Sequence, residues 1–410
     1  MTQAVKTPLT PYQWKLFAFL SVACLFEGYD FFALAQILPN LRANFGLSEG
    51  AGGLLVAVIN VGTIIAYLLI RQTDRWGRRR MLMITIAGYT LMSLLTGLAW
   101  DVWSFGTFQM VARIFLIAEW AITMVYAAEE FPADRRGMVI GVIQAMNSVG
   151  AVACAGIVPL LLKTELGWRM VYFIGVIPLI FIMIWRRGLK ETRRFEEQGV
   201  AAAARETSFF AVWHTPARRR IVQMGIIWTL TYLCTQSAVT FWKEFAIAER
   251  GMTDGDVGLA ITIGAVGSMP LIFMAGKLLD VVGRRIGATI IFLACSGSVV
   301  AMYTLETWAS LTAMIVLGIF GVSAVLPVLN TYNTELFPTR VRSDAFAWSN
   351  NIIGRVGYVL APLAVGTMAQ TWGWGPSVSL TAIGPLIALG LIWLWLPETK
   401  GRELEEIAGA

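Results

Sequence analysis

The sequence predicts an all-α membrane protein whose twelve transmembrane helices form two pseudo-symmetric six-helix bundles. Composition is the first observation behind this fold class. Of the 410 residues, 57% are hydrophobic and only 14% are charged, and the mean hydropathy is +0.67. These values lie far outside the balance of a soluble globular protein. The second observation is that loop motifs of the first half recur in the second half at a nearly constant offset.

Twelve segments are long and apolar enough to cross a bilayer, which takes roughly 20 residues per helix. The apolar run of the first span follows Lys6 and Lys15, but it is too long for a signal peptide and lacks a small-residue cleavage site, so we expect it to be retained. The predicted spans are 14–38, 51–71, 81–100, 104–127, 138–162, 169–187, 220–243, 256–278, 286–304, 309–333, 343–370 and 375–396.

The internal repeat predicts how these spans are organised. The loop after the second span reads DRWGRRR from Asp74, and DVVGRR follows from Asp280, 206 residues later. At the same offset, EEFPADRRG from Glu129 matches ELFPTRVRS from Glu335. Because six spans are an even number, both halves have the same orientation, related by an axis along the membrane normal. Such halves can rock about a shared central site.

Positive charge predicts the orientation in the membrane. Arginine and lysine concentrate in the loops on one side, and cytoplasmic loops retain such residues. We therefore expect a multi-pass protein of the cell inner (plasma) membrane with both termini in the cytoplasm. The expected parts are an N-terminal bundle at 1–187, a cytoplasmic linker at 188–218 and a C-terminal bundle with its tail at 219–410. The net charge of +6 follows from this bias, so we expect no nucleic-acid partner.

The residues that would indicate an enzyme are missing from the sequence. It has no phosphate-binding glycine loop, metal-ligand cluster or nucleophile constellation. The four cysteines lie within predicted spans without redox spacing, so we interpret them as small apolar core residues. We expect a monomeric secondary transporter with no enzymatic activity, no cofactor and no metal. The cysteines are Cys24, Cys154, Cys234 and Cys295.

Two carboxyl groups, Glu27 and Asp30, interrupt the first span in the segment FEGYDFFALAQ. A charge at the bilayer centre costs roughly 2.5 to 3.5 kcal/mol. The two residues are about 60° apart on a helix, so both can face one cavity. Since close buried carboxylates repel, one of them is suited to carry a proton. The only histidine, His214, lies in the linker. The alternative is a structural pair with an arginine of another helix.

Two arginines, Arg113 and Arg355, are predicted at membrane depth. Arg355 has Asn351 one helical turn before it and Tyr358 one turn after it. A guanidinium beside an aromatic ring suits a planar carboxylate, through bidentate hydrogen bonds and stacking. We therefore predict that this face binds an anionic substrate, with an internal ion pair as the alternative. For Arg113, substrate contact, coupling and structural pairing remain open.

Other polar residues give weaker signals. Helical spacing can direct Gln144, Asn147 and Gln236 inward, where they would contact substrate or serve as interhelical hydrogen-bonding groups. Lys243 and Glu244 interrupt the outer end of the seventh span, where snorkelling to the interface is expected.

The fourth span holds a further acid, Glu119. It lies six residues after Arg113, about 240° away on a helix, so the two do not share a face. An additional proton site and a pair with another span are both open for it.

The combination of motifs resembles the major facilitator superfamily over essentially the whole chain. It comprises the D-R-x-G-R-R loop at Asp74, its echo at Asp280 and the ending PETKGRELEEI. That ending looks like the sugar-porter and organic-ion branch. FEGYD is similar to the acidic signature of proton-coupled aromatic-acid and metabolite symporters. Departures from the family pattern are Ile70, Ile117 and Glu119, where glycines are usual.

The cytoplasmic loops are expected to work as a conformational latch between the halves. A tight helix connection needs glycine, an aspartate can cap a helix start, and arginines hold the loop in the cytoplasm. Simple topological anchoring is the alternative. The predicted latch residues are Asp74, Arg78, Glu129 and Arg136, with the repeats Asp280, Arg284, Glu335 and Arg342.

Together, these features predict proton-coupled import of a small organic anion, such as an aromatic, mono- or dicarboxylic acid, by alternating access. The anion would bind Arg355, and Glu27, Asp30 or Glu119 would carry the proton. Import is expected because inward proton movement gains roughly 2.3 kcal/mol per charge per 100 mV. Alternatives are an antiporter that exports organic cations or drugs, a sugar or polyol carrier, and a membrane receptor that does not transport.

Overall fold

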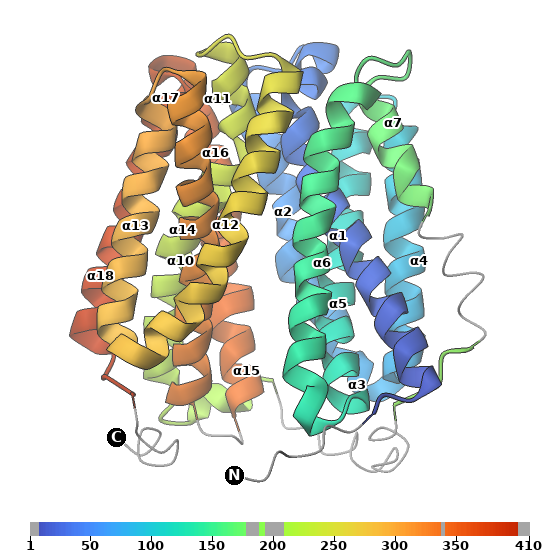
Figure 1. Cartoon of the computed structure of the whole chain (residues 1–410), viewed down its shortest axis with the longest axis vertical. Coiled ribbons are helices and arrows are strands. Elements are labelled where there is room, and N and C mark those ends of the chain that lie inside the picture. Colours follow the sequence, from blue (N-terminus) through green and yellow to red (C-terminus); the bar gives the residue numbers. More distant parts are fainter. Residues whose placement is uncertain (1–7, 178–187, 193–208, 338–340, 401–410) are drawn as a thin grey trace. The chain divides into compact units, whose positions relative to one another are not determined.

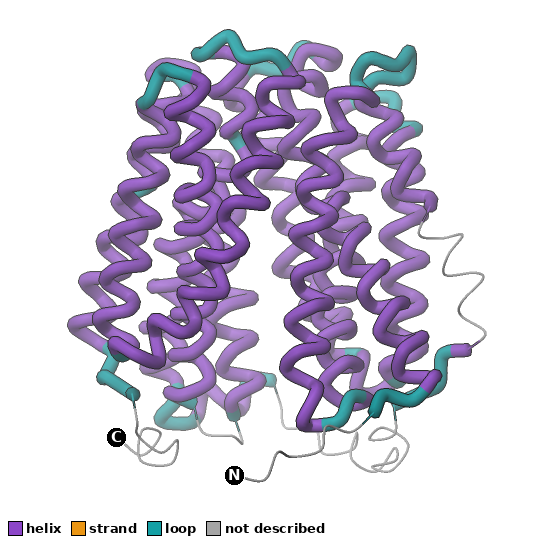
Figure 2. Tube along the Cα trace, in the orientation of Figure 1, coloured by secondary structure: helices purple, strands orange, loops and turns teal. Residues whose placement is uncertain are grey.

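The computed structural model describes residues 8–177, 188–192, 209–337 and 341–400. In these ranges every regular element is a helix (Figure 1), and the loops gather at the ends of the helices (Figure 2). The N-terminal half contains α1 (Pro11–Phe45), α2 (Glu49–Arg71), α3 (Thr73–Trp76), α4 (Arg78–Gly97), α5 (Val102–Glu130), α6 (Ala133–Leu161), α7 (Trp168–Phe173) and η1 (Ile174–Val176).

The C-terminal half repeats this order of long helices. It contains η3 (Ala211–His214), α10 (Arg218–Thr240), α11 (Trp242–Ala248), α12 (Asp254–Val282), α13 (Arg284–Thr304), α14 (Trp308–Leu336), α15 (Arg342–Phe346), the π-helix η4 (Ala347–Gly354), α16 (Arg355–Trp372), α17 (Trp374–Thr381) and α18 (Ile383–Trp395).

The described helices agree with the predicted spans, and the all-α fold is confirmed. Among the described residues, ten helices or helix runs are long and apolar enough to cross a membrane. The predicted span 220–243 forms α10, a helix of 23 residues that is not one of these ten. The predicted span 169–187 begins as α7 and η1, and its remainder from residue 178 lies outside the described residues.

Backbone geometry supports the internal repeat. Gly77 and Gly283, the last residues before α4 and α13, have φ angles of 87° and 96°. Side chains with a Cβ avoid this region of backbone conformation, so these two tight turns require glycine. Four other glycines with positive φ also occur at equivalent places of the two halves, namely Gly46 with Gly251 and Gly167 with Gly373.

The chain divides into two compact units that do not follow the halves of the sequence strictly. The first unit comprises residues 1–37 and 61–206, and the second comprises 38–60 and 207–410. The sequence predicts bundles at 1–187 and 219–410. The end of α1 and the first half of α2 therefore pack with helices of the C-terminal half.

Candidate functional site

Three carboxyl groups are buried among the described residues of the first unit. Glu27 and Asp30 come from α1 and Glu119 comes from α5, with exposed fractions of 4%, 5% and 1%. One helical turn separates the two α1 residues. Glu119 is close enough to interact electrostatically with both of them. The structure therefore brings together the three acids that the sequence singles out inside the membrane.

Asp30 has polar partners on two neighbouring helices. The Ser93 hydroxyl of α4 donates a hydrogen bond to Oδ1 of Asp30 at 3.2 Å. Arg113 of α5 attracts the same carboxyl group, and its guanidinium lies 4.7 Å from the centroid of the Phe31 ring. The ionised form of Asp30 thus has both a hydrogen-bond donor and a countercharge.

Glu27 and Glu119 lie in a different environment. Oε2 of Glu27 and both carboxyl oxygens of Glu119 have no hydrogen-bond partner among the described residues. The Cys24 thiol is within hydrogen-bonding reach of Glu27, and Cys24 belongs to an apolar core cluster that also contains Leu116 and Ile122, one turn on either side of Glu119. Burying an unpaired carboxylate costs several kcal/mol. The neutral, protonated acid is therefore the form that suits this environment.

The second unit contains a half-buried cation beside aromatic rings. The guanidinium carbon of Arg355 lies 6.0 Å from the ring centroid of Tyr232 and 5.3 Å from that of Tyr358. These two rings meet edge to face at 5.3 Å, and Trp228 stacks on Tyr232 at 5.1 Å. We refer to Arg355, Trp228, Tyr232 and Tyr358 as the Arg355 box.

The guanidinium of the Arg355 box keeps hydrogen-bonding capacity. Its Nε is buried and has no hydrogen-bond partner among the described residues. A guanidinium with a free N–H and aromatic walls can bind a planar carboxylate by a charge-assisted hydrogen bond, and the rings can stack on a conjugated ligand.

Asn350, which the sequence does not single out, bonds to Tyr232 of the Arg355 box. Its Nδ2 donates to the Tyr232 hydroxyl at 3.3 Å, and it is 4% exposed, whereas Asn351 is half-buried. The reason is the π-helix η4, in which hydrogen bonds span five residues rather than four. A position five residues before Arg355 then shares its face. The only sign of this arrangement in the sequence is the adjacent pair Asn350 and Asn351, and the pair does not show which asparagine a π-helix turns toward the aromatic rings.

The remaining predicted polar residues have local contacts. Gln144 is exposed, with its Nε2 3.7 Å from the Met124 sulfur, and Gln236 donates to Thr240 at 3.1 Å. The backbone carbonyl of Asn147 lies where a Cβ on Gly28 would sit, so α1 and α6 touch beside Glu27. In the described residues these contacts do not join Gln144 or Gln236 to the buried acids or to Arg355.

A polar network closes the loop end of the first unit. Nη2 of Arg78 bonds to Oε1 of Glu129 at 3.1 Å, and Thr192 donates to the other oxygen of Glu129 at 2.6 Å. Glu191 accepts hydrogen bonds from the backbone N–H groups of Arg78 and Arg79, at 2.9 and 3.1 Å. The start of α4, the end of α5 and the segment after the sixth span are thereby joined.

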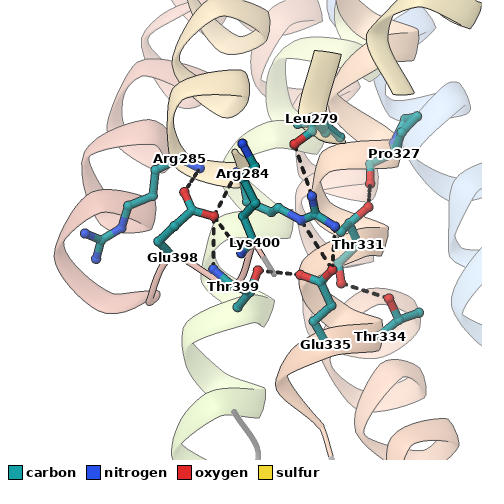
Figure 3. A network of polar contacts seen from close by, with 10 residues as sticks. All are labelled: Leu279, Arg284, Arg285, Pro327, Thr331, Thr334, Glu335, Glu398, Thr399 and Lys400. Atoms are coloured by element: carbon teal, nitrogen blue, oxygen red, sulfur yellow. Dashed lines mark hydrogen bonds and ion pairs between the residues drawn. The ribbon is translucent and has the colours of Figure 1, made fainter. Parts of the chain in front are cut away.

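The second unit contains the same network in its own residues (Figure 3). Arg284 bonds to Glu335 at 2.9 Å, and the Thr399 hydroxyl donates to the same carboxylate. Glu398 accepts from the backbone N–H groups of Arg284 and Arg285, both at 2.9 Å. Burial alone would raise the pKa of Glu398, but these bonds, with others from the backbone of residues 399 and 400, hold that pKa below its ordinary value.

The other predicted latch residues also repeat. Nε of Arg136 donates to the carbonyl of Phe131 at 3.4 Å, and Nε of Arg342 donates to that of Phe337 at 3.1 Å. The side chains of Asp74 and Asp280 lie outside the described residues. All bonds described for the two networks lie within one unit, so each network holds the loop end of its own unit together. A latch between the halves stays a prediction.

No group of three or more histidine, cysteine, aspartate or glutamate side chains that could hold a metal ion occurs in the described part of the chain.

Comparisons with known proteins agree with these features. The family model described as Major Facilitator Superfamily matches residues 20–246 and 229–409. The probable 4-methylmuconolactone transporter of Cupriavidus pinatubonensis is 26% identical over 411 residues, which cover 98% of this chain and 94% of the relative. The cis,cis-muconate transport protein of Acinetobacter baylyi is 27% identical over 370 residues, covering 87% and 88% of the two chains.

A solved structure shows the likeness of fold. The inward-open xylose transporter XylE from E. coli matches with a TM-score of 0.77 and 18% identity, over 97% of this chain and 99% of that one.

Proposed function

The chain belongs to the major facilitator superfamily, and on this premise we propose that it imports a small organic anion together with protons by alternating access. It is a multi-pass membrane protein and a transporter rather than an enzyme. The proposal places it in the inner membrane as a monomer, with both termini in the cytoplasm, as the arginine-rich loops suggest. The bundles at 1–187 and 219–410 would be the moving parts, joined by the linker at 188–218.

The observation that carries the anion assignment is the Arg355 box. Nε of Arg355 is buried and has no hydrogen-bond partner among the described residues, and a substrate carboxylate would supply both an acceptor for this N–H and a countercharge. The aromatic rings favour a planar acid, because flat conjugated groups stack on them. The relatives named for muconate and methylmuconolactone support an organic acid as the substrate.

The buried acids of the first unit support proton coupling. Glu27 and Glu119 suit a proton carrier, because the neutral form fits their apolar surroundings and the charged form would need water or a cation. Asp30 has Arg113 and Ser93 as partners, so we assign it to holding Arg113 in place. Protonation of Glu27 or Glu119 neutralises a carboxylate inside the membrane and would thereby lower the electrostatic barrier to the conformational change.

One observation favours a second function. Carboxyl oxygens without hydrogen-bond partners could also bind an organic cation directly, as in a proton-coupled exporter. Cation and proton would then compete for Glu27 and Glu119, and Arg355 would be unnecessary for transport.

Proteoliposomes loaded with a pH dye separate the two functions. We expect aromatic and dicarboxylic acids added outside to acidify the lumen, beyond the rate in protein-free vesicles, which reports passive entry of neutral acid. The signal should disappear in Arg355→Ala. It should also fall strongly in Arg355→Lys, because lysine keeps the charge but loses the planar pair of donors. Lumen alkalinisation driven by organic cations, unchanged in Arg355→Ala, would establish the exporter instead.

A further inference from the structure

A cluster of charged groups lies at the end of the second unit opposite its arginine-rich loops, near α11 and α17 (Figure 1). Arg42, in the last turn of α1, bonds through Nη2 to Glu49 at 2.7 Å and through Nη1 to Glu244 of α11 at 2.8 Å. Its guanidinium also lies 5.6 Å from the centroid of the Trp374 ring. We refer to Arg42, Glu49, Glu244 and Trp374 as the Arg42 cluster.

The ion pair between Arg42 and Glu244 is largely buried, whereas the Glu49 side chain is 37% exposed. The side chains of Arg42 and Glu244 are 14% and 3% exposed, and Lys243, which pairs with Asp254 at 2.5 Å, is 2% exposed. The expected snorkelling of Lys243 and Glu244 to the interface is therefore wrong. Both side chains are instead buried and paired, because Asp254 of α12 and Arg42 of α1 supply the countercharges.

Below the Arg42 cluster, α2 is packed closely against α16. A Cβ on Gly53 would lie 2.3 Å from the carbonyl oxygen of Pro362, and one on Gly366 would lie 2.8 Å from that of Glu49. Two turns further along α2, Nδ2 of Asn60 donates to the carbonyl of Tyr358 at 3.1 Å. The contact between the two helices thus runs from the Arg42 cluster to a member of the Arg355 box.

The two partners of Arg42 differ in one respect. Glu49 follows Arg42 in the same half of the sequence, whereas Glu244 belongs to the other half. If the outer ends of α1 and α2 move away from the C-terminal helices, Arg42 keeps Glu49 as its countercharge. Glu244 loses its partner but becomes exposed to water, which solvates the carboxylate. Opening therefore leaves no buried unpaired charge, the state that makes a broken buried ion pair costly.

We propose that the Arg42 cluster is the outer gate of the transporter. The bond from Arg42 to Glu244 holds the outer ends of α1 and α2 against the C-terminal helices, and it breaks whenever the Arg355 box opens to the outside. This inference rests on the alternating-access part of the proposed function. It does not depend on the substrate or on which acid carries the proton.

Labelling of a single cysteine tests the gate without any substrate. Ala57 is 4% exposed and shares a face of α2 with Gly53 and Asn60, four residues after the first and three before the second. Ala57→Cys is introduced into a variant in which the four native cysteines are replaced, and a membrane-impermeant maleimide is added outside. We expect Glu244→Gln to raise the initial labelling rate several-fold, because the amide no longer holds Arg42 across the two halves.

Two control variants separate gating from general loosening. Glu49→Gln also removes a carboxylate from Arg42, but it leaves the bond to Glu244, so labelling should be no faster than in the parent. Arg250 lies at the same end and donates to the carbonyl oxygens of Leu305 and Thr304, at 2.8 and 3.4 Å, within the C-terminal half. Arg250→Gln should leave the rate unchanged.

The gate is wrong if Glu244→Gln labels at the parental rate, or if all three variants raise the rate equally. If Glu244→Gln does not fold, Arg42→Lys replaces it. Lysine has a single ammonium group, which cannot replace the two guanidinium nitrogens that bond separately to Glu49 and Glu244. Faster labelling is therefore expected, and an unchanged rate would contradict the proposal. Because no substrate is used, a failed transport assay with a positive labelling result would overturn the substrate assignment and leave the gate standing.

Discussion

The two units have nearly the same polar network at their loop ends and opposite charges in their interiors. Arg78 and Glu129 in the first unit correspond to Arg284 and Glu335 in the second, with ion-pair distances of 3.1 and 2.9 Å. Among the described residues, the first unit buries three acids, and the second holds a half-buried arginine beside aromatic rings. The two repeats therefore share the polar network at their loop ends but differ in the charged groups of their interiors.

This difference suggests a division of labour. A network that occurs twice at one end of each unit fits a structural task that both bundles share. Interior groups that occur once fit tasks that a transporter needs once, namely binding an anion and carrying a proton. Substitutions of the interior groups and of the loop networks test that division.

The largest effect is expected from the interior of the second unit. Arg355→Ala should lower the kcat/KM of uptake by about 100-fold, because losing charge-assisted hydrogen bonds to the substrate costs about 3 kcal/mol. Initial rates of radiolabelled acid uptake measure this effect. Arg250→Gln, which removes a cation bonded to backbone carbonyls, is the matched control. Equal losses in both variants would contradict a specific role for Arg355.

The acids of the first unit should separate into two classes. Glu119→Gln keeps the shape of a neutral acid, so it should preserve exchange of labelled for unlabelled substrate across the membrane while abolishing proton-driven accumulation. Asp30→Asn leaves Arg113 without its nearby carboxylate, so it should lower folded yield and exchange together. Parallel counterflow and pH-dye assays distinguish the two. Loss of exchange in Glu119→Gln would favour a structural role for that acid.

Sequence reasoning located the interior charges because their cost in a membrane makes them conspicuous. Glu27, Asp30, Glu119 and Arg355 all stand out from apolar runs. The loop networks were likewise visible as repeated motifs. In both cases the signal is local, since it lies in residue type and spacing within one segment.

The partners of those charges were not predictable in the same way. Ser93 reaches Asp30 from another helix, and Glu244 reaches Arg42 from the other half of the chain. Such pairs depend on tertiary packing, which one helix's periodicity does not encode. The position of Asn350 depends on a π-helix, whose changed register comes from hydrogen bonding within the folded chain and not from residue type.

Substitutions in the loop networks should have matched, moderate effects on stability. The paired side chains are 12% exposed in the first unit and 15% exposed in the second. Glu129→Gln and Glu335→Gln should therefore each destabilise the detergent-solubilised protein by about 1 to 3 kcal/mol, with similar falls in the thermal midpoint. Substrate affinity at the Arg355 box should change little. A large fall in only one variant would break the equivalence of the two networks.

The smallest effect is expected from acid titration of Glu398. Its pKa is held below the ordinary value of 4.5 by backbone N–H donors, despite partial burial. Because the folded-state pKa is depressed, its ionised form stabilises the fold at neutral pH, and this contribution is lost as the pH falls from 4.5 through the lower folded-state value. Glu398→Gln should therefore be less stable than the parent at pH 7, and the difference should shrink below pH 4.5. If the stability difference between Glu398→Gln and the parent stays constant with pH, the contribution of residue 398 does not depend on the charge of its carboxylate.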